Sequence, residues 1–144
     1  MTVTAILSHK GSDVLTIEPA ADLAAAARLL VERRIGALVV TGVDNRVVGI
    51  LSERNIVRAF AERGAKALAV PVAEVMTRTV VTCGLAETVS EIMERMTAGK
   101  FRHVPVVDEQ GRLAGIVSIG DVVKWRLDEM KHESGALRDY IRTA

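Results

Sequence analysis

Apolar residues at positions i, i+3, i+4 and i+7 form one hydrophobic stripe along residues 22–34, and the same spacing returns over residues 88–99. Such a stripe is typical of an α-helix with one buried face. The two stripes consist of Leu23, Ala26, Ala27 and Leu30 in the first segment and of Val89, Ile92, Met93 and Met96 in the second. Asp22 and Thr88 stand directly before the stripes and are preferred N-cap residues, so helices are expected to begin there.

Short runs rich in Val, Ile and Leu flank these helices and predict β-strands. The predicted strands lie around residues 14–17, 37–41 and 46–51, and again around residues 80–83, 103–107 and 112–117. Turns rich in Gly, Asp, Asn and Gln join the last two strands of each set, which predicts an antiparallel hairpin in each. Further helices are expected over residues 52–63 and 118–130, and apolar positions within residues 127–142 continue the pattern as a C-terminal helix.

The chain repeats itself at an offset of 66 residues. Gly49–Val57 reads GILSERNIV, and Gly115–Val123 reads GIVSIGDVV; the same offset aligns Arg46 with Arg112. The sequence therefore contains two units of the form strand, helix, strand, strand, helix. A unit of about 50–60 residues buries little surface alone. We therefore expect an α+β fold in which two βαββα units, related by a pseudo-twofold axis, pack their sheets together with the helices outside.

The repeat also predicts the domain boundaries. We expect the first unit over residues 5–64 and the second unit over residues 77–130. Residues 65–76 are expected to form a linker and a short helix that leads into the second unit, and residues 131–144 a C-terminal helical tail.

Composition excludes several classes of function. Lys and Arg number 19 against 18 Asp and Glu, so the net charge of +1 gives no bulk attraction to nucleic acid or to an anionic membrane. No apolar run approaches the roughly 20 residues of a membrane-spanning helix, and the N-terminus lacks a signal-peptide pattern. The single cysteine, Cys83, excludes an internal disulfide framework, suits a reducing cytosol, and is expected to be a small core residue. We therefore expect a soluble cytoplasmic protein without a metal site.

Ser52 and Ser118 each follow a predicted strand and precede a predicted helix, and two interpretations of this position are open. In the structural interpretation each serine is an N-cap, and Asn55 or Asp121 accepts a backbone hydrogen bond in return. In the functional interpretation the helix N-terminus attracts an anion, the serine contacts a phosphate, and the carboxylate binds ribose hydroxyls. The two interpretations are compatible, because a capping serine can also touch a ligand.

The doubled Gly-x-x-Ser-x-x-Asn/Asp pattern and the segment Arg102–Asp108 resemble a tandem pair of cystathionine β-synthase (CBS) domains, a Bateman module. The resemblance covers roughly residues 5–130 and is to the stand-alone bacterial type. It implies a regulatory fold that binds AMP, ADP, ATP, NAD or S-adenosylmethionine in a cleft between the two units, with AMP or NAD expected first. It also implies that Asp121 holds the ribose and that Ser118 contacts phosphate.

The resemblance implies further site residues. Arg102 and His103 precede the middle strand, where members of the family meet phosphates, whereas Gly36 and Ala37 occupy the matching positions of the first unit. Asn55 replaces the aspartate of the first unit and loses a charge-assisted bond, so the second unit is expected to hold the stronger site. The weaker candidates are Ser52 and Asn55 in the first unit, Arg54 and Lys10 toward phosphate, and Thr16 and Thr82 toward adenine. Each also has an ordinary structural interpretation as an exposed charge, a cap or a strand residue.

Three classes of function follow. The leading one is a non-catalytic sensor that binds an adenine nucleotide and signals through a homodimer to a separate regulated protein. The alternatives are a ligand-free scaffold for dimerisation and docking, and a hydrolase or transferase acting on nucleotides. Catalysis is not expected, because the serines lie at cap positions and nothing indicates that Asp121 orients His103 toward Ser118. The dimer interface is expected on residues 89–99 and 122–130, with contributions from Met93, Met96, Val122 and Trp125.

Overall fold

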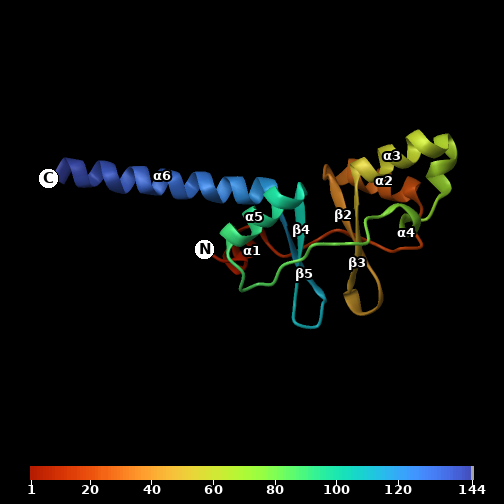
Figure 1. Ribbon diagram of the computed structural model, residues 1–144, viewed down its shortest axis with the longest axis horizontal. Helices are drawn as coiled ribbons and strands as arrows, with labels where there is room; N and C mark the ends of the chain where they lie inside the picture. Colours follow the sequence, from red (N-terminus) through yellow and green to blue (C-terminus); the bar gives the residue numbers. More distant parts are fainter. Residues whose placement is uncertain (144) are drawn as a thin grey trace.

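The computed structural model describes residues 1–143, except for the side chains of residues 139, 142 and 143. Two small sheets stand beside each other in the middle of the molecule, and the helices lie on the outer sides (Figure 1). Each sheet has its own buried hydrophobic cluster. The predicted α+β fold of two repeated units is therefore confirmed.

The first unit contains a three-stranded sheet with β2 in its centre. β1 (Thr16–Ile17) runs parallel to β2 (Ala37–Thr41), and β2 pairs antiparallel with β3 (Val47–Ser52) through the 3-10 turn η1 (Val43–Asn45). The helices α2 (Leu23–Arg33) and α3 (Glu53–Arg63) pack on this sheet, and the 3-10 segment η2 (Gly64–Ala69) follows. Asp22 caps α2 as predicted, since its carboxylate accepts the Ala25 N–H at 2.8 Å.

The second unit repeats this arrangement with a smaller sheet. β4 (His103–Val107) and β5 (Leu113–Ser118) form an antiparallel hairpin, covered by α5 (Val89–Gly99) and α6 (Ile119–Thr143). The strand predicted around residues 80–83 is reduced to one isolated bridge between Cys83 and Val106. That part of the sequence prediction is wrong, because only Cys83 of this segment bonds to β4, through its backbone N–H and C=O.

The pseudo-twofold axis is marked by a contact between two equivalent residues. Arg46 and Arg112, which lie 66 positions apart, form an antiparallel bridge between the two units. A residue that pairs with its own repeat equivalent must lie close to the symmetry axis. Asn45 adds a side-chain hydrogen bond to the Leu113 carbonyl at 3.4 Å, so the two hairpins contact each other along this edge.

Each unit is completed by a helix that comes from elsewhere in the chain. α1 (Val3–Lys10) packs on the second unit, whereas α4 (Val72–Val75), which precedes the second unit, packs on the first. The packing is close: a Cβ at Gly115 would lie 2.7 Å from Leu7, and a Cβ at Gly49 would lie 2.4 Å from Met76. Whereas the sequence-based boundary places residue 5 onward in the first unit, the structure thus packs α1 on the second.

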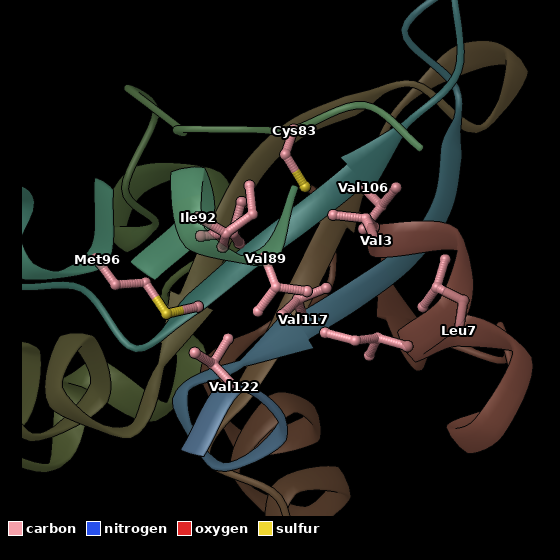
Figure 2. Close-up of a cluster of buried hydrophobic side chains, with 11 residues drawn as sticks. Val3, Leu7, Cys83, Val89, Ile92, Met96, Val106, Val117 and Val122 are labelled. Carbon is pink, nitrogen blue, oxygen red and sulfur yellow. The ribbon is translucent and has the colours of Figure 1, made fainter. Parts of the chain in front are cut away.

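Figure 2 shows the core to which α1 contributes. Met96 and Val122 are 4% and 2% exposed and belong to this cluster, on the side away from Val3 and Leu7. Their predicted role in a dimer interface is therefore wrong, since both side chains are already buried within the unit. Cys83 is 2% exposed in the same cluster, which confirms its expected place in the core.

α6 is longer than the helix predicted to end at residue 130. It joins that helix to the predicted C-terminal helix in one unbroken run of 25 residues, about 37 Å long, which projects beyond the body of the molecule (Figure 1). Nowhere in residues 1–143 does a helix combine the length and the apolar character needed to cross a membrane.

Candidate functional site

The turn from β5 into α6 holds a reciprocal cap between Ser118 and Asp121. The Ser118 N–H donates to Asp121 Oδ2 at 2.8 Å, and the Asp121 N–H donates to Ser118 Oγ at 3.2 Å. The equivalent turn of the first unit has the same arrangement, since the Ser52 N–H donates to Asn55 Oδ1 at 2.8 Å and the Asn55 N–H to Ser52 Oγ at 3.3 Å. The structural interpretation of both serines is therefore confirmed, and the compatible functional interpretation depends on what surrounds them.

Helix α1 brings a cation to the second of these turns. Lys10 Nζ donates to Asp121 Oδ2 at 2.6 Å and to the carbonyl of Ile116 at 2.9 Å. In the first unit the segment after α4 takes the same place, where Asn55 Nδ2 donates to Thr77 Oγ1 at 3.4 Å. One turn thus carries a lysine–aspartate ion pair, and its repeat equivalent carries a neutral amide–hydroxyl contact.

The contacts of Asp121 keep its carboxylate ionised. Burial alone would raise the pKa of this carboxyl, but hydrogen bonds from Lys10 and from the Ser118 N–H outweigh it and lower the pKa below the ordinary value. Both donors use Oδ2, and none of the groups that the structure describes donates to Oδ1. The carboxylate is therefore charged, fixed through one oxygen, and able to accept a ligand hydroxyl at the other.

His103 lies close to this ion pair and is half-buried. Burial lowers the pKa of His103 below its ordinary value, and the positive charge of Lys10 lowers the pKa further, partly offset by Asp121. The ring is consequently neutral at pH 7. His103 on β4 is also the cross-strand partner of Ser118 on β5, so the histidine and the capping serine lie side by side in the ladder.

The first unit approaches the site at Gly36. A Cβ at Gly36 would lie 3.9 Å from His103 Cε1 and 2.9 Å from Glu53 Oε1, so His103 of the second unit and Glu53 of the first face each other across this glycine. Glu53 is not among the site residues expected from the sequence. Only the packing of the two units reveals its position, because its own neighbours in sequence mark an ordinary first turn of a helix.

The expected site residues fall into two groups. Ser118, Asp121, Lys10 and His103 come together, and exposed Arg102 adjoins them through its carbonyl, which accepts the Ile119 N–H at 2.8 Å. The others are dispersed. Thr16 pairs with Val39 in the first sheet, the Thr82 carbonyl accepts a bond from Arg95, Arg54 is exposed on α3, and Ser52 and Asn55 form the other turn.

A cavity of about 790 Å³ opens from the ion pair along the groove between α1 and α6. Trp125 and Ile6 provide apolar surface in this groove, and His9, Lys124 and His132 provide ionisable groups. The residues that line this cavity come from the N-terminal segment and the second unit, and His103 and Ser118 are not among them, so the cavity is distinct from the cleft between the two units. Among the side chains that the structure describes, no group of three or more His, Cys, Asp or Glu residues is arranged to hold a metal ion.

Comparison with known proteins places this geometry in context. The family model of the CBS domain matches residues 5–62 and again residues 72–128. The chain is similar to the crystal structure of the CBS-domain containing protein ATU1752 from Agrobacterium tumefaciens, with 49% identity and a TM-score of 0.82 over 88% of this chain and 99% of that one.

Two further solved structures contain ligands. The CBS domain protein PAE2072 from Pyrobaculum aerophilum, complexed with AMP, is 29% identical, with a TM-score of 0.75 over 84% of this chain and 89% of that one. The CBS domain pair of protein MJ0100, in complex with 5′-methylthioadenosine and S-adenosyl-L-methionine, is 26% identical, with a TM-score of 0.80 over 90% of this chain and 98% of that one.

Curated relatives contain the same module in proteins of different length. An uncharacterised 17.7 kDa protein from Acidianus ambivalens is 37% identical over 115 residues, which cover 80% of this chain and 68% of that protein. The inosine-5′-monophosphate dehydrogenase of Methanocaldococcus jannaschii is 31% identical over 114 residues, but this chain covers only 22% of its length. This chain spans 58% and 40% of the full length of two further curated relatives.

Proposed function

Since the chain belongs to the CBS domain family as a tandem pair, we propose that it is a non-catalytic regulatory module that binds an adenine nucleotide at Asp121, in the cleft between the two units. The observation that carries this proposal is the ionised carboxylate of Asp121, whose Oδ1 is open to a ligand hydroxyl at the N-terminus of α6. The solved relatives that contain AMP, 5′-methylthioadenosine and S-adenosyl-L-methionine support a ligand of this chemical class.

The groups around Asp121 suit the parts of a nucleotide. Its Oδ1 would accept the ribose hydroxyls, while Lys10 holds Oδ2 and need not be displaced. Phosphate oxygens would meet the helix N-terminus, the Ser118 hydroxyl, and the nearby side chains of His103 and Arg102. AMP and NAD are the ligands proposed first, because both carry an adenosine with a 5′-phosphate.

We propose one strong site per chain. In the first unit Asn55 is neutral and its amide is engaged with Thr77, and Gly36 and Ala37 stand where the second unit has Arg102 and His103. The charge that would attract a phosphate and the carboxylate that would bind ribose are therefore both absent from these positions. A titration is expected to give a stoichiometry of one nucleotide per chain.

The arrangement of Ser118, His103 and Asp121 does not favour nucleophilic catalysis. In a triad the carboxylate orients the histidine, which then accepts a proton from the serine. Here the Asp121 carboxylate binds Lys10 and the Ser118 N–H, and Ser118 Oγ accepts the backbone N–H of Asp121. The similarity to a dehydrogenase covers a small part of that enzyme, and its activity does not carry over to this chain.

The output of the module is proposed to pass through a homodimer to a separate regulated protein in the cytoplasm. A ligand shifts such an assembly only by binding two of its states with different affinity. The alternative is a ligand-free scaffold for dimerisation and docking, and binding measurements separate the two.

The test is a thermal-shift panel of AMP, ADP, ATP, NAD, NADH and S-adenosylmethionine, with GTP as a control, followed by calorimetric titration. Asp121→Ala is expected to weaken the bound nucleotide at least tenfold, about 1.4 kcal/mol. Asn55→Ala, at the equivalent position of the first unit, is the matched control and should retain the wild-type affinity. Binding that is unaffected by Asp121→Ala would contradict the proposed site, and turnover of any nucleotide would favour the enzyme. The absence of binding by every ligand would favour the scaffold.

A further inference from the structure

The C-terminal half of α6 extends beyond the part of the chain that the family model matches. The match ends at residue 128, whereas the helix continues to Thr143 and stands clear of the two units (Figure 1). This extension is not needed to complete the second core, whose most C-terminal buried residue is Val122. The side chains of this extension therefore take no part in the buried core of the second unit.

An exposed apolar stripe runs along the helix at alternating spacings of four and three residues. The stripe consists of Val123, Leu127, Met130, Leu137 and Ile141, which are 49%, 51%, 48%, 61% and 66% exposed, with Ser134 at the one polar position of the series. Alternation of four and three is the heptad spacing of the a and d positions of a coiled coil. In this register Leu127, Ser134 and Ile141 occupy a positions, and Val123, Met130 and Leu137 occupy d positions.

An extension of this composition is poorly stable in water by itself. Helices in proteins are stabilised mainly by packing of an apolar face, which this extension lacks, and a glycine in a helix interior costs about 1 kcal/mol relative to alanine. Gly135 lies in the middle of the extension, and a Cβ there would meet nothing within 4 Å. Packing of the exposed stripe against another helix would supply the missing stabilisation.

The charged residues beside the stripe distinguish an antiparallel from a parallel pair of α6 helices. In an antiparallel pair of these helices with full overlap, e positions face e positions of the other helix and g positions face g positions. Lys131 would then face Lys131 of the other copy, Lys124 would face Arg138, and Glu133 would face Glu133. Every charged flanking pair of the antiparallel arrangement is thus repulsive.

A parallel pair replaces part of this repulsion with attraction. There a g residue meets the e residue five positions later on the other helix, so Glu133 pairs with Arg138 on both sides of the seam. Arg126 approaches Lys131, but Arg126 already pairs with Glu129 of its own helix at 3.2 Å. Ser134 would face its own copy, and a polar residue at one a position fixes the register of a parallel coiled coil.

We propose that the α6 helices of two copies of this chain associate as a parallel two-stranded coiled coil along the stripe from Val123 to Ile141. The inference rests on the proposed function only in that it supplies the homodimer through which the module would signal. Nucleotide binding at Asp121 does not require it.

The first test is the mass in solution of the full chain, measured by light scattering during size-exclusion chromatography. The wild type is expected at twice the 15.5 kDa of one chain. Leu137→Glu places a charge on the seam and should weaken association more than roughly tenfold. Ala136→Glu introduces the same side chain at an exposed c position and should leave the dimer intact.

The second test identifies the orientation. In the parallel arrangement residue 134 faces residue 134, so Ser134→Cys should form an intermolecular disulfide under mild oxidation. Ala136→Cys, off the seam, should not. The native Cys83 is buried and does not interfere.

The outcomes separate this inference from the proposed function. Dimers that survive Leu137→Glu would overturn the coiled coil and would leave signalling through a dimer of the body intact. A wild type that is monomeric at micromolar concentration would overturn both. Dimers that fail to link through Ser134→Cys would overturn the parallel arrangement. In Leu137→Glu the buried Cys83 should remain protected from Ellman's reagent, which confirms that the second core of the variant is folded.

Discussion

Lys10 Nζ lies 2.6 Å from Asp121 Oδ2, so a residue at the end of the first helix holds the carboxylate that begins the last one, 111 positions away. Because α1 packs on the second unit, the ion pair forms only when that unit and the N-terminus are assembled. The charge of the candidate site therefore depends on the packing of α1 against the second unit. The repeated strands and helices of either unit could not form this ion pair without α1.

Replacement of this lysine tests how much the ion pair contributes to binding. Lys10→Met keeps much of the side-chain length but removes the ammonium, so the pKa of Asp121 should rise toward its ordinary value. Since Asp121 itself remains, the nucleotide should bind roughly threefold to tenfold more weakly, a smaller loss than for Asp121→Ala. NMR titration of the Asp121 carboxyl and calorimetry measure the two effects.

Lys66→Met provides the control for the Lys10 variant, because Lys66 is exposed on η2 and the change in net charge is the same. An Asp121 pKa that does not move in Lys10→Met would show that the ion pair is absent in solution. A Lys10→Met affinity as low as that of Asp121→Ala would instead assign the lysine a direct contact with the ligand.

His103 makes the affinity for a phosphate-bearing nucleotide depend on pH. Its pKa is lowered in the free protein, mainly by burial and then by Lys10, so the ring is neutral at pH 7. A bound phosphate favours the imidazolium and raises this pKa, so binding takes up a proton between the two pKa values. The affinity should therefore increase as the pH falls through the pKa of the bound form toward the lowered pKa of the free protein.

The control for this effect is His103→Gln, which keeps a hydrogen-bonding side chain without a titration near neutrality. Titration of the ligand's own phosphate is common to both proteins, so the difference between their pH profiles isolates the histidine. Identical profiles for the wild type and His103→Gln would place the phosphate away from His103.

The fold could be predicted from the sequence because its signals are local and repeated. The two helical stripes, the hairpin turns and the capping residues Asp22 and Thr88 each act over a few positions, and the 66-residue offset doubles every one of them. The strand around residues 80–83 could not be predicted correctly, because apolar residues next to a sheet need not pair with it. The apolar stripe alone cannot assign Met96 and Val122 to a core or to an interface, and the structure buries both.

The candidate site could be predicted only in part. Ser118 and Asp121 are three residues apart in one turn, so their mutual hydrogen bonds follow from local geometry. The resemblance places Lys10 toward phosphate, but its contact with Asp121 depends on the packing of α1. Glu53 could not be predicted at all, since it reaches the neighbourhood of His103 in the second unit only across Gly36 of its own unit.

The buried thiol of Cys83 should resist modification in the folded protein. Burial, with a smaller contribution from the charge of Glu87, raises its pKa to about 11, and the thiolate is the reactive form. Ellman's reagent at pH 8 is therefore expected to react with Cys83 only after the chain is unfolded in denaturant. Rapid reaction of the native protein would show that the second core opens locally, and the thermal stability measured in parallel would reveal whether the whole chain is involved.

Gly115 tests whether the close packing of α1 stabilises the second unit. A Cβ at this position would lie 2.7 and 2.8 Å from the two methyl carbons of Leu7, which is buried in the core. Gly115→Ala should therefore force Leu7 to move and should lower the free energy of unfolding by about 1–3 kcal/mol. Gly84→Ala is the control, because a Cβ there would meet only the Glu87 carboxylate, at 4.0 Å.

A double-mutant cycle then assigns the cost at Gly115 to this contact. Leu7→Ala alone should destabilise by about 2–5 kcal/mol, because it leaves a cavity in the second core. In that background the added methyl of Gly115→Ala occupies space that Leu7 has vacated, so its further cost should fall below about 0.5 kcal/mol. Urea unfolding of the four proteins measures the coupling. Strictly additive effects would mean that α1 does not press on β5 in solution, and the position of Lys10 beside Asp121 would then have no structural support.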